Sequence, residues 1–147
     1  MTIPKFARGK FAFKNKEKYV GLKTPTYRSG WEHAFMRLCD EHPNVYKWAS
    51  ESIRIPYRHP LTGKYTIYVP DFFIVYNDKN GRKHAEMIEV KPMSQITMEM
   101  AGKSMGKRKQ VVLNQAKWEA ANAYAKQHKL RFRVVSEDQL FHNGKRK

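Results

Sequence analysis

Three charged residues stand at the ends of two apolar runs between Val69 and Pro92, which reads VPDFFIVYNDKNGRKHAEMIEVKP. Asp71 opens the first run, and Glu89 and Lys91 close the second. Charged side chains are rare inside strands unless they are paired, hydrated or bound to a ligand. Carboxylate oxygens are the ligands that Mg²⁺ and Mn²⁺ prefer, so this pattern suits a metal site if the two carboxylates meet.

The turn between the two runs decides whether they meet. The runs are joined by an Asn-Gly pair, Asn80-Gly81, which is a strong hairpin signal. A two-residue loop made of this pair would place Asp71 opposite Val90. Because side chains alternate between the faces of a sheet, Asp71 and Glu89 would then lie on different faces.

A three-residue loop over residues 79–81, with glycine in the left-handed position of a bulge, gives a different register. It pairs Asp78 with Arg82 and therefore Asp71 with Glu89. Directly opposed side chains have Cβ atoms about 4.5–5.5 Å apart. Two carboxylates at that distance repel each other, and a divalent cation relieves the repulsion. We therefore predict a bulged hairpin that brings both carboxylates to one metal ion.

Lys91 shares a strand face with Glu89, because residues i and i+2 point the same way. A metal ion lowers the pKa of a bound water and neutralises charge on a phosphate. A neighbouring ammonium group can orient that water and stabilise the developing charge. Pro70 can interrupt sheet pairing beside Asp71 and so leave room for a ligand. The alternative interpretation is that these are ordinary surface charges at strand ends.

The net charge of the chain indicates the class of partner that the protein binds. The 147 residues include 29 Lys and Arg against 13 Asp and Glu, a formal net charge of +16. Such a balance favours nucleic acid first and an anionic membrane surface second. Cys39 is the only cysteine, which excludes an internal disulfide framework and a multi-cysteine zinc site. No run of 18 apolar residues exists, so no membrane span is expected, and a reducing cytoplasm fits best.

The elements that would position these groups follow the order α-β-β-β-α-β. Ser29 can cap a helix in a capping box with Glu32, and His42-Pro43 should end it. Strands are expected over 52–57, 65–76, 84–91 and 131–135, a second helix over 110–129, a mobile loop over 93–109 and a helical turn over 136–140. We divide the chain into a basic aromatic arm (1–24), one domain (25–141) and a basic tail (142–147). The aromatic side chains of the arm can pack on the domain or on bases.

The pattern Pro-Asp…Glu-Val-Lys resembles that of the PD-(D/E)XK nuclease superfamily. The blocks TYRSGWEHAF, SESIRIPY, VPDFFI, MIEVKP and AKWEAANAYAKQHKLRFRVVSEDQL resemble, in order and spacing over residues 24–140, the head-completion nucleases of T-even-like phages. The smaller pattern is shared with a transposon endonuclease subunit and with phage Holliday-junction resolvases. The resemblance implies an α/β (α+β) restriction-endonuclease-like core with a mixed central sheet flanked by helices.

The resemblance also implies a function and a site. The function is Mg²⁺-dependent cleavage of DNA, with Mn²⁺ as a substitute, during completion of the packaged phage head. This places the protein in the cytoplasm of an infected bacterial host or on the virion, with portal or head proteins as partners. Glu32, Asp71 and Glu89 match the acidic residues of the family, the backbone carbonyl of Val90 would face the metal, and Lys91 matches the catalytic lysine.

The sequence leaves open the form of the DNA substrate and the oligomeric state of the protein. Double-stranded and branched DNA both suit the charge, and the protein can be a monomer or a homodimer. A Holliday-junction resolvase, a transposon-end nuclease and a non-catalytic DNA-binding head protein are the alternative functions. Glu32 can serve as a helix cap, a metal ligand or both. Candidate phosphate contacts are Arg28, Lys103, Lys107, Arg108, Lys109 and Lys117.

Overall fold

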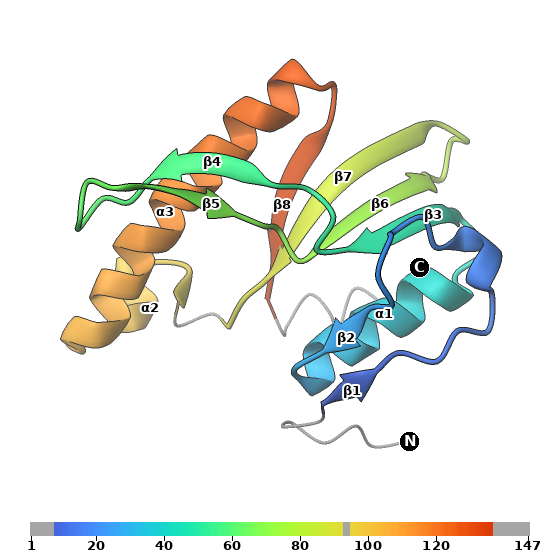
Figure 1. The fold of residues 1–147 in the computed structure, drawn as a ribbon, viewed down its shortest axis with the longest axis horizontal. Helices are drawn as coiled ribbons and strands as arrows, with labels where there is room; N and C mark the ends of the chain where they lie inside the picture. The colour runs from blue at the N-terminus through green and yellow to red at the C-terminus, as the bar shows by residue number, and fades with distance from the viewer. Residues whose placement is uncertain (1–7, 93–94, 137–147) are drawn as a thin grey trace.

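A mixed four-stranded sheet forms the centre of the computed structural model, which describes residues 8–92 and 95–136 (Figure 1). The strand order is β3-β6-β7-β8, with β3 and β7 antiparallel to β6 and β8 parallel to β7. The strands are β3 (Val45–Ser50), β6 (Phe72–Asn77), β7 (Lys83–Val90) and β8 (Arg131–Val135). Helices α1 (Gly30–Glu41) and α3 (Met105–Gln127) cover opposite sides of the sheet. The predicted fold class is confirmed.

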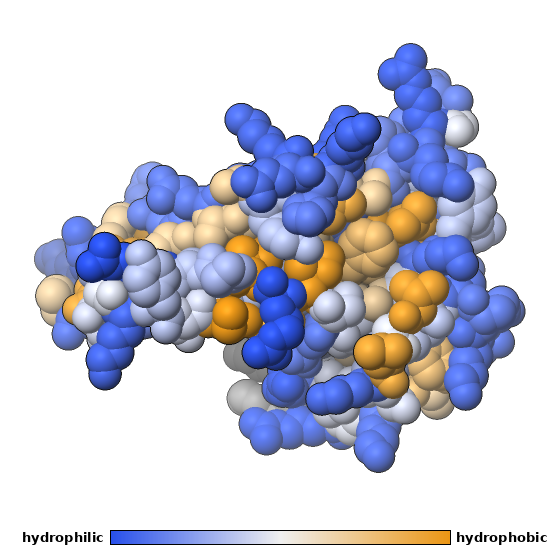
Figure 2. Space-filling model, turned by 45° about the horizontal axis from the view of Figure 1, so that its top comes forward, coloured by the Kyte–Doolittle hydropathy of each residue, from blue (hydrophilic) through white to orange (hydrophobic). Residues whose placement is uncertain are grey.

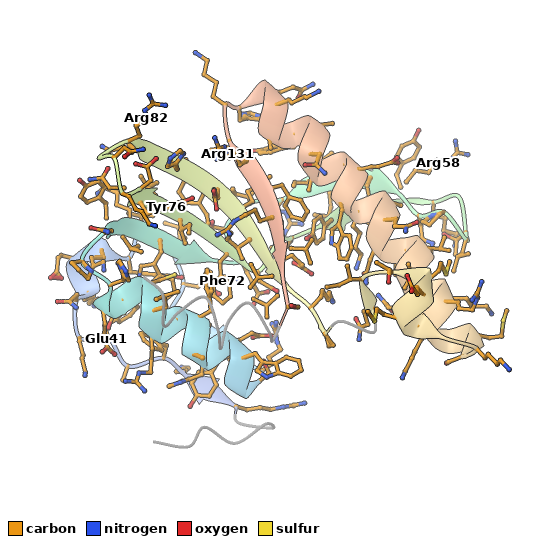
Figure 3. The ribbon with its side chains drawn as sticks, turned by 180° about the vertical axis from the view of Figure 1, so that it is seen from behind. Glu41, Arg58, Phe72, Tyr76, Arg82 and Arg131 are labelled. Atoms are coloured by element: carbon orange, nitrogen blue, oxygen red, sulfur yellow. The ribbon has the colours of Figure 1, made fainter. Side chains whose placement is uncertain are left out.

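Successive side chains of the strands point to opposite faces of the sheet and divide the core into two layers. Phe72 and Ile88 face α1, where Phe72 packs against Phe35 with ring centroids 4.7 Å apart (Figure 3). Met87, one residue along β7, packs on the other side with Ala121 of α3. This alternation is the period-2 pattern expected for a sheet covered on both faces.

The hairpin between β6 and β7 has the three-residue loop that the sequence predicted. Asn77 pairs with Lys83, and the Asp78 N–H donates to the Arg82 carbonyl at 2.9 Å. Gly81 has a φ of 78°, the left-handed conformation that glycine adopts without steric cost. Its N–H donates to the Asp78 carbonyl at 3.1 Å. The bulged turn is therefore confirmed.

A second hairpin precedes β6 and forms a sheet of its own. Strands β4 (Ile55–Arg58) and β5 (Tyr65–Tyr68) pair only with each other and pack on α3. The chain then passes through Val69 and Pro70 before β6 begins, so the predicted interruption at Pro70 is confirmed. Figure 1 shows this hairpin crossing α3 and extending beyond it.

The part of the basic arm from residue 8 onward packs on the domain. It contains β1 (Gly9–Lys10) and the 3-10 turn η1 (Lys16–Lys18), and β1 pairs with β2 (Thr26–Tyr27). Phe11 is buried, and its ring lies edge-on to Trp48 at 5.7 Å. Of the two roles left open for its aromatic side chains, packing on the domain is the one observed. The predicted boundary at residue 24 therefore divides the chain by charge but not by packing.

Charged groups hold this segment against the end of α1. The buried Asp40 carboxylate accepts from the backbone N–H groups of Lys14 and Asn15 at 2.8 and 3.0 Å. The Lys18 ammonium donates to the carbonyls of Asp40 and His42, both at 2.9 Å. A cation at a helix C-terminus satisfies carbonyls that have no partner within the helix.

Two expectations were wrong. Strand β3 was not predicted, because a register shift between Val45 and Lys47 spoils its alternation. Residues 93–109 were expected to form a loop, yet α2 (Met98–Ala101) lies there and α3 begins at Met105, where the Ser104 hydroxyl accepts from the Lys107 N–H.

No helix in residues 8–92 and 95–136 is long and apolar enough to cross a membrane. Residues 137–140 of the predicted helical turn, and the tail, lie outside the described residues.

The left-handed conformation of Gly81 gives a first prediction. Substitution by alanine meets no atom within 4 Å, so any cost comes only from the backbone conformation. We expect Gly81→Ala to lower the free energy of unfolding by about 1 kcal/mol, measured by urea denaturation. The neighbouring change Asn80→Ala is the control and should alter it by less than about 0.5 kcal/mol. Equal effects would show that the turn does not depend on glycine.

Candidate metal centre and nuclease site

The register of the hairpin places Asp71 directly across from Glu89, at the point where pairing of β6 with β7 ends. The Asp71 N–H donates to Glu89 Oε1 at 3.2 Å. The Val90 N–H donates to Asp71 Oδ2 at 2.8 Å. The Glu89 carboxylate therefore accepts from the backbone of Asp71, and the Asp71 carboxylate accepts from the residue after Glu89. The two acidic side chains lie together as predicted.

Pro70 explains why the ladder stops here. In this register Pro70 would face Val90, and proline has no N–H to donate to the Val90 carbonyl. The Lys91 N–H bonds to Val135 of β8 at 3.0 Å, so the pairing of β7 with β8 continues past this point. The N–H and C=O of one strand residue point to the same side. The Val90 carbonyl therefore points to the side of the Asp71 carboxylate, and its role as a metal ligand stays a prediction.

Burial makes two negative charges unfavourable in this position. Asp71 is partly exposed as a residue, but its carboxyl group lies deep in the protein. Burial, and next the Glu89 charge, raise the pKa of Asp71 well above its usual range. Burial also raises the pKa of Glu89, while the Lys91 ammonium and the nearby Tyr68 hydroxyl lower it in part. A cation between the carboxylates would offset this cost.

Lys91 contributes the first cation of the site. Its Nζ lies 3.7 Å from Glu89 Oε2, and its side chain is 24% exposed. A half-buried ammonium group in this position neutralises part of the carboxylate charge and still faces solvent. The sequence prediction that Glu89 and Lys91 share one face is confirmed.

Lys117 contributes a second cation, from α3. Its Nζ lies 5.7 Å from the Tyr68 ring centroid. Burial and the Lys91 charge lower the pKa of Lys117, and the charges of Glu89 and Asp71 oppose that change. The sequence suggested Lys117 as a phosphate contact, and that role stays a prediction. Its charge interactions with Glu89 and Asp71 show that its ammonium group, on a partly buried face of α3, lies near the two carboxylates.

The position of Lys117 can be found from helix periodicity. The buried residues of α3 include Asn114 and Ala121. Lys117 is three residues after the first and four before the second, so it lies on the same buried face of the helix. Tyr68 was also not predicted at the site; the alternation of β5 directs it inward, opposite to exposed Ile67.

Glu32 reaches the region from α1, on the other side of the sheet. Its carboxylate accepts from the Arg28 N–H at 3.0 Å, and the Ser29 hydroxyl accepts from the Glu32 N–H at 3.1 Å. The expected capping box is therefore present, with Arg28 rather than Ser29 as the backbone donor. The Glu32 charge raises the pKa of Asp71. Within residues 8–92 and 95–136, however, no three His, Cys, Asp or Glu side chains converge as a metal site, so ligation by Glu32 stays a prediction.

Arg28 pairs with a carboxylate that was not in the predicted set. Arg28 Nη1 lies 3.1 Å from Glu51 Oε1. Glu51 has a φ of 49°, and its N–H donates to the Asp71 carbonyl at 2.9 Å. Both residues line a cavity of about 680 Å³ on this side of the site. Glu51 follows β3 directly, so missing that strand also left the position of Glu51 unknown.

The remaining predicted phosphate contacts lie in the first turns of α3 and in the turn that precedes it. All four are exposed, and Arg108 Nη1 donates to the Gly102 carbonyl at 3.0 Å. At 1.5 Å per residue, Lys107 lies about 15 Å along the helix from Lys117. These side chains can contact a nucleic-acid backbone that also reaches the carboxylates, and that role stays a prediction. They are Lys103, Lys107, Arg108 and Lys109.

The raised pKa of the Asp71 carboxyl gives a second prediction, for protein in a chelating buffer. In the pH range between the pKa of Asp71 in the unfolded state and its higher pKa in the folded state, the folded protein binds more protons than the unfolded one. The free energy of unfolding therefore falls as the pH rises through this range. Asp71→Asn keeps an oxygen for the Val90 N–H and removes the charge. It should raise the free energy of unfolding at pH 7 by about 1 kcal/mol. The gain should shrink below pH 5.

Asp78 is the control, because its pKa is lowered to about 2, first by its hydrogen bond with His84. A lowered pKa contributes stability above the ordinary carboxylate pKa, and this is lost as the pH falls. Asp78→Asn should therefore lower stability at pH 7. Urea denaturation from pH 3 to 8 measures both variants. Loss of stability in Asp71→Asn at pH 7 would contradict this account of the site.

Comparison with known proteins identifies the family of the chain. The family model described as the TnsA-like endonuclease N-terminal domain matches residues 42–137, which include Asp71, Glu89, Lys91 and Lys117. The chain is also 32% identical over 140 residues to the head completion nuclease of Enterobacteria phage T4, covering 90% of this chain and 92% of that protein. The predicted resemblance is confirmed. The chain therefore belongs to the TnsA-like endonuclease family, with a restriction-endonuclease-like fold, and it is a deoxyribonuclease.

Proposed function

We propose that this enzyme hydrolyses DNA phosphodiester bonds with Mg²⁺, or Mn²⁺ in its place, during completion of a packaged phage head. The observation that supports metal dependence best is the buried pair of Asp71 and Glu89 carboxylates, whose pKa values are both raised. Hard oxygen donors of this kind suit Mg²⁺, which keeps several waters as further ligands. The Val90 carbonyl would be a third oxygen donor, and Glu32, whose carboxylate accepts from the Arg28 N–H, would have to turn toward the site to be a fourth. The residues present therefore fit the ion.

Each side chain has a distinct task in this proposal. Asp71 and Glu89 would hold the ion, which when bound would activate a water and neutralise charge on the phosphate. Lys91, 3.7 Å from Glu89, orients the attacking water and stabilises the charge that develops on the phosphorane. Lys117 approaches from α3 and contacts a non-bridging phosphate oxygen. The ammonium groups of Lys91 and Lys117 favour binding of an anionic substrate at this site.

The biological role rests on the relative from phage T4, whose name is head completion nuclease. By this proposal the enzyme acts in the cytoplasm of an infected bacterium or on the virion, beside portal or head proteins. The match to a TnsA-like endonuclease domain favours a second candidate, a nuclease for transposon ends or branched DNA. Enzymes that cut both strands of a junction usually act as dimers, so the mass in solution separates the two. A head protein without catalysis is the third candidate.

Cleavage of linear, nicked and branched DNA, with and without Mg²⁺, tests the proposal. We expect cutting only with the ion. Lys91→Ala should lower kcat by about 10²–10³-fold and retain DNA binding, because the lysine acts in the transition state. Lys83→Ala, an exposed lysine on the same strand, is the control and should cut normally. Absence of cutting on every substrate would contradict metal-dependent hydrolysis. Normal maturation of phage heads with Lys91→Ala would show that catalysis is not the biological role.

Thermal stability measures metal binding without DNA. An ion that binds only the folded state adds about 2.7 kcal/mol at 100 times its Kd. We expect Mn²⁺ to raise the melting temperature of the parent protein and to have no such effect on Glu89→Gln. Glu99→Gln, an exposed carboxylate on α2, is the matched control and should respond like the parent. An equal response in all three proteins would place the ion elsewhere.

A further inference from the structure

The outer face of the β4–β5 hairpin carries exposed side chains, of which Arg58 also donates from Nε to the Gly63 carbonyl at 3.0 Å. The inner face packs on α3 through Ile55, Tyr57 and Tyr68, which are all buried. The outer face presents the cross-strand pair Arg58 and Tyr65. Next to it lies the pair Pro56 and Ile67, and all four outer residues are exposed. The inner face packs the hairpin on α3, and the exposed outer face is available for a ligand.

Tyr65 and Arg58 form a flat, charged surface at the free end of the hairpin. The Tyr65 side chain is 80% exposed, and the Arg58 guanidinium carbon lies 5.8 Å from its ring centroid. Figure 3 shows Arg58 at the outer end of the hairpin, pointing away from α3. Exposed aromatic rings and guanidinium groups are the side chains on which nucleic-acid bases stack.

The charge of the hairpin segment favours the same partner. Between Glu51 and Asp71 the chain has no acidic residue, and it carries Arg54, Arg58 and Lys64, all exposed. A surface that combines exposed apolar groups with basic groups alone is complementary to a polyanion with aromatic bases. Figure 2 shows hydrophobic side chains on this side of the molecule bordered by hydrophilic ones.

The outer face also continues toward the carboxylates. Arg54 and Val69 line the cavity of about 680 Å³ whose wall includes Glu51, and the Glu51 N–H bonds to the Asp71 carbonyl. Val69 is four residues along the chain from Tyr65, and alternate residues of an extended segment share a face. At about 3.3 Å per strand residue this is about 13 Å. Four nucleotides of one DNA strand span a similar length.

We propose that this outer face is a stacking platform for unpaired nucleotides, so that the enzyme prefers DNA with a single-stranded end or branch. Bases inside a duplex have both faces covered by their neighbours, whereas the bases of an unpaired segment can each expose a face to Tyr65. The basic residues of the segment contact the phosphates of the same strand. The inference rests on the proposed function, because it names the form of DNA that reaches the carboxylates.

Equilibrium binding tests the platform in a Lys91→Ala background and a chelating buffer, in which no cleavage is expected. The probes are a labelled duplex with a single-stranded overhang and a blunt duplex of the same paired sequence. Stacking on one aromatic ring changes affinity by about tenfold, or 1.4 kcal/mol. We expect Tyr65→Ala to weaken binding of the overhang duplex by about this factor and that of the blunt duplex by less than about twofold. Tyr65→Phe keeps the ring and should bind like the parent.

Tyr46 provides a matched control at the far end of the central sheet. It is also an exposed tyrosine under a cation, with Lys83 Nζ 5.1 Å from its ring centroid. Tyr46→Ala should leave the binding of both probes unchanged. A 2-aminopurine in the overhang should lose fluorescence on binding to the parent and keep it with Tyr65→Ala, while unchanged melting temperatures show that the variants fold.

Two results would overturn the platform. One is equal affinity of Tyr65→Ala and the parent for the overhang duplex, and the other is an equal loss for the overhang and the blunt duplex. Neither result affects the nuclease proposal, which is measured separately by Mg²⁺-dependent cutting with unsubstituted Lys91. Absence of cutting with retained Tyr65-dependent binding would instead contradict the nuclease proposal and leave the platform standing.

Discussion

One extra residue in a turn brings together the two carboxylates of this protein. The loop over residues 79–81 has Gly81 at a φ of 78°, and this fixes the register of β6 against β7. A register one residue different would move Asp71 to the other face of the sheet. The chemistry of the site is thus decided at the far end of the hairpin, about 20 Å along the strand from Asp71.

The site lies where the pairing of β6 with β7 ends. Pairing of β6 with β7 stops at Pro70, which has no N–H, while β7 continues along β8 through the Lys91 N–H. Asp71 and Glu89 accept from the backbone groups that this interruption leaves available. Burial then raises the pKa of both acids. The fold accepts this electrostatic cost where a bound cation can offset it, as is common at functional sites.

Sequence reasoning succeeded where a local rule fixes geometry and failed where tertiary structure overrides it. The Asn-Gly signal allows two turns, and the three-residue turn was expected because it pairs Asp71 with Glu89. The capping pattern predicted the start of α1. Strand β3 was missed because its irregular register hides the alternation. The start of α3 was missed because its first turns are exposed and basic, with no apolar face to show a helical period. The approach of Lys117 depends on how α3 packs on the sheet, which local pattern reasoning did not reveal.

Direct location of the metal tests the central claim most sharply. Crystals grown with Mn²⁺ and a non-cleavable DNA can be measured at the manganese absorption edge, where the anomalous signal marks the ion. The account predicts a peak between the carboxylates of Asp71 and Glu89, within about 2.0–2.3 Å of an oxygen from each. A peak at another site, or none beside these two residues at saturating Mn²⁺, would contradict it.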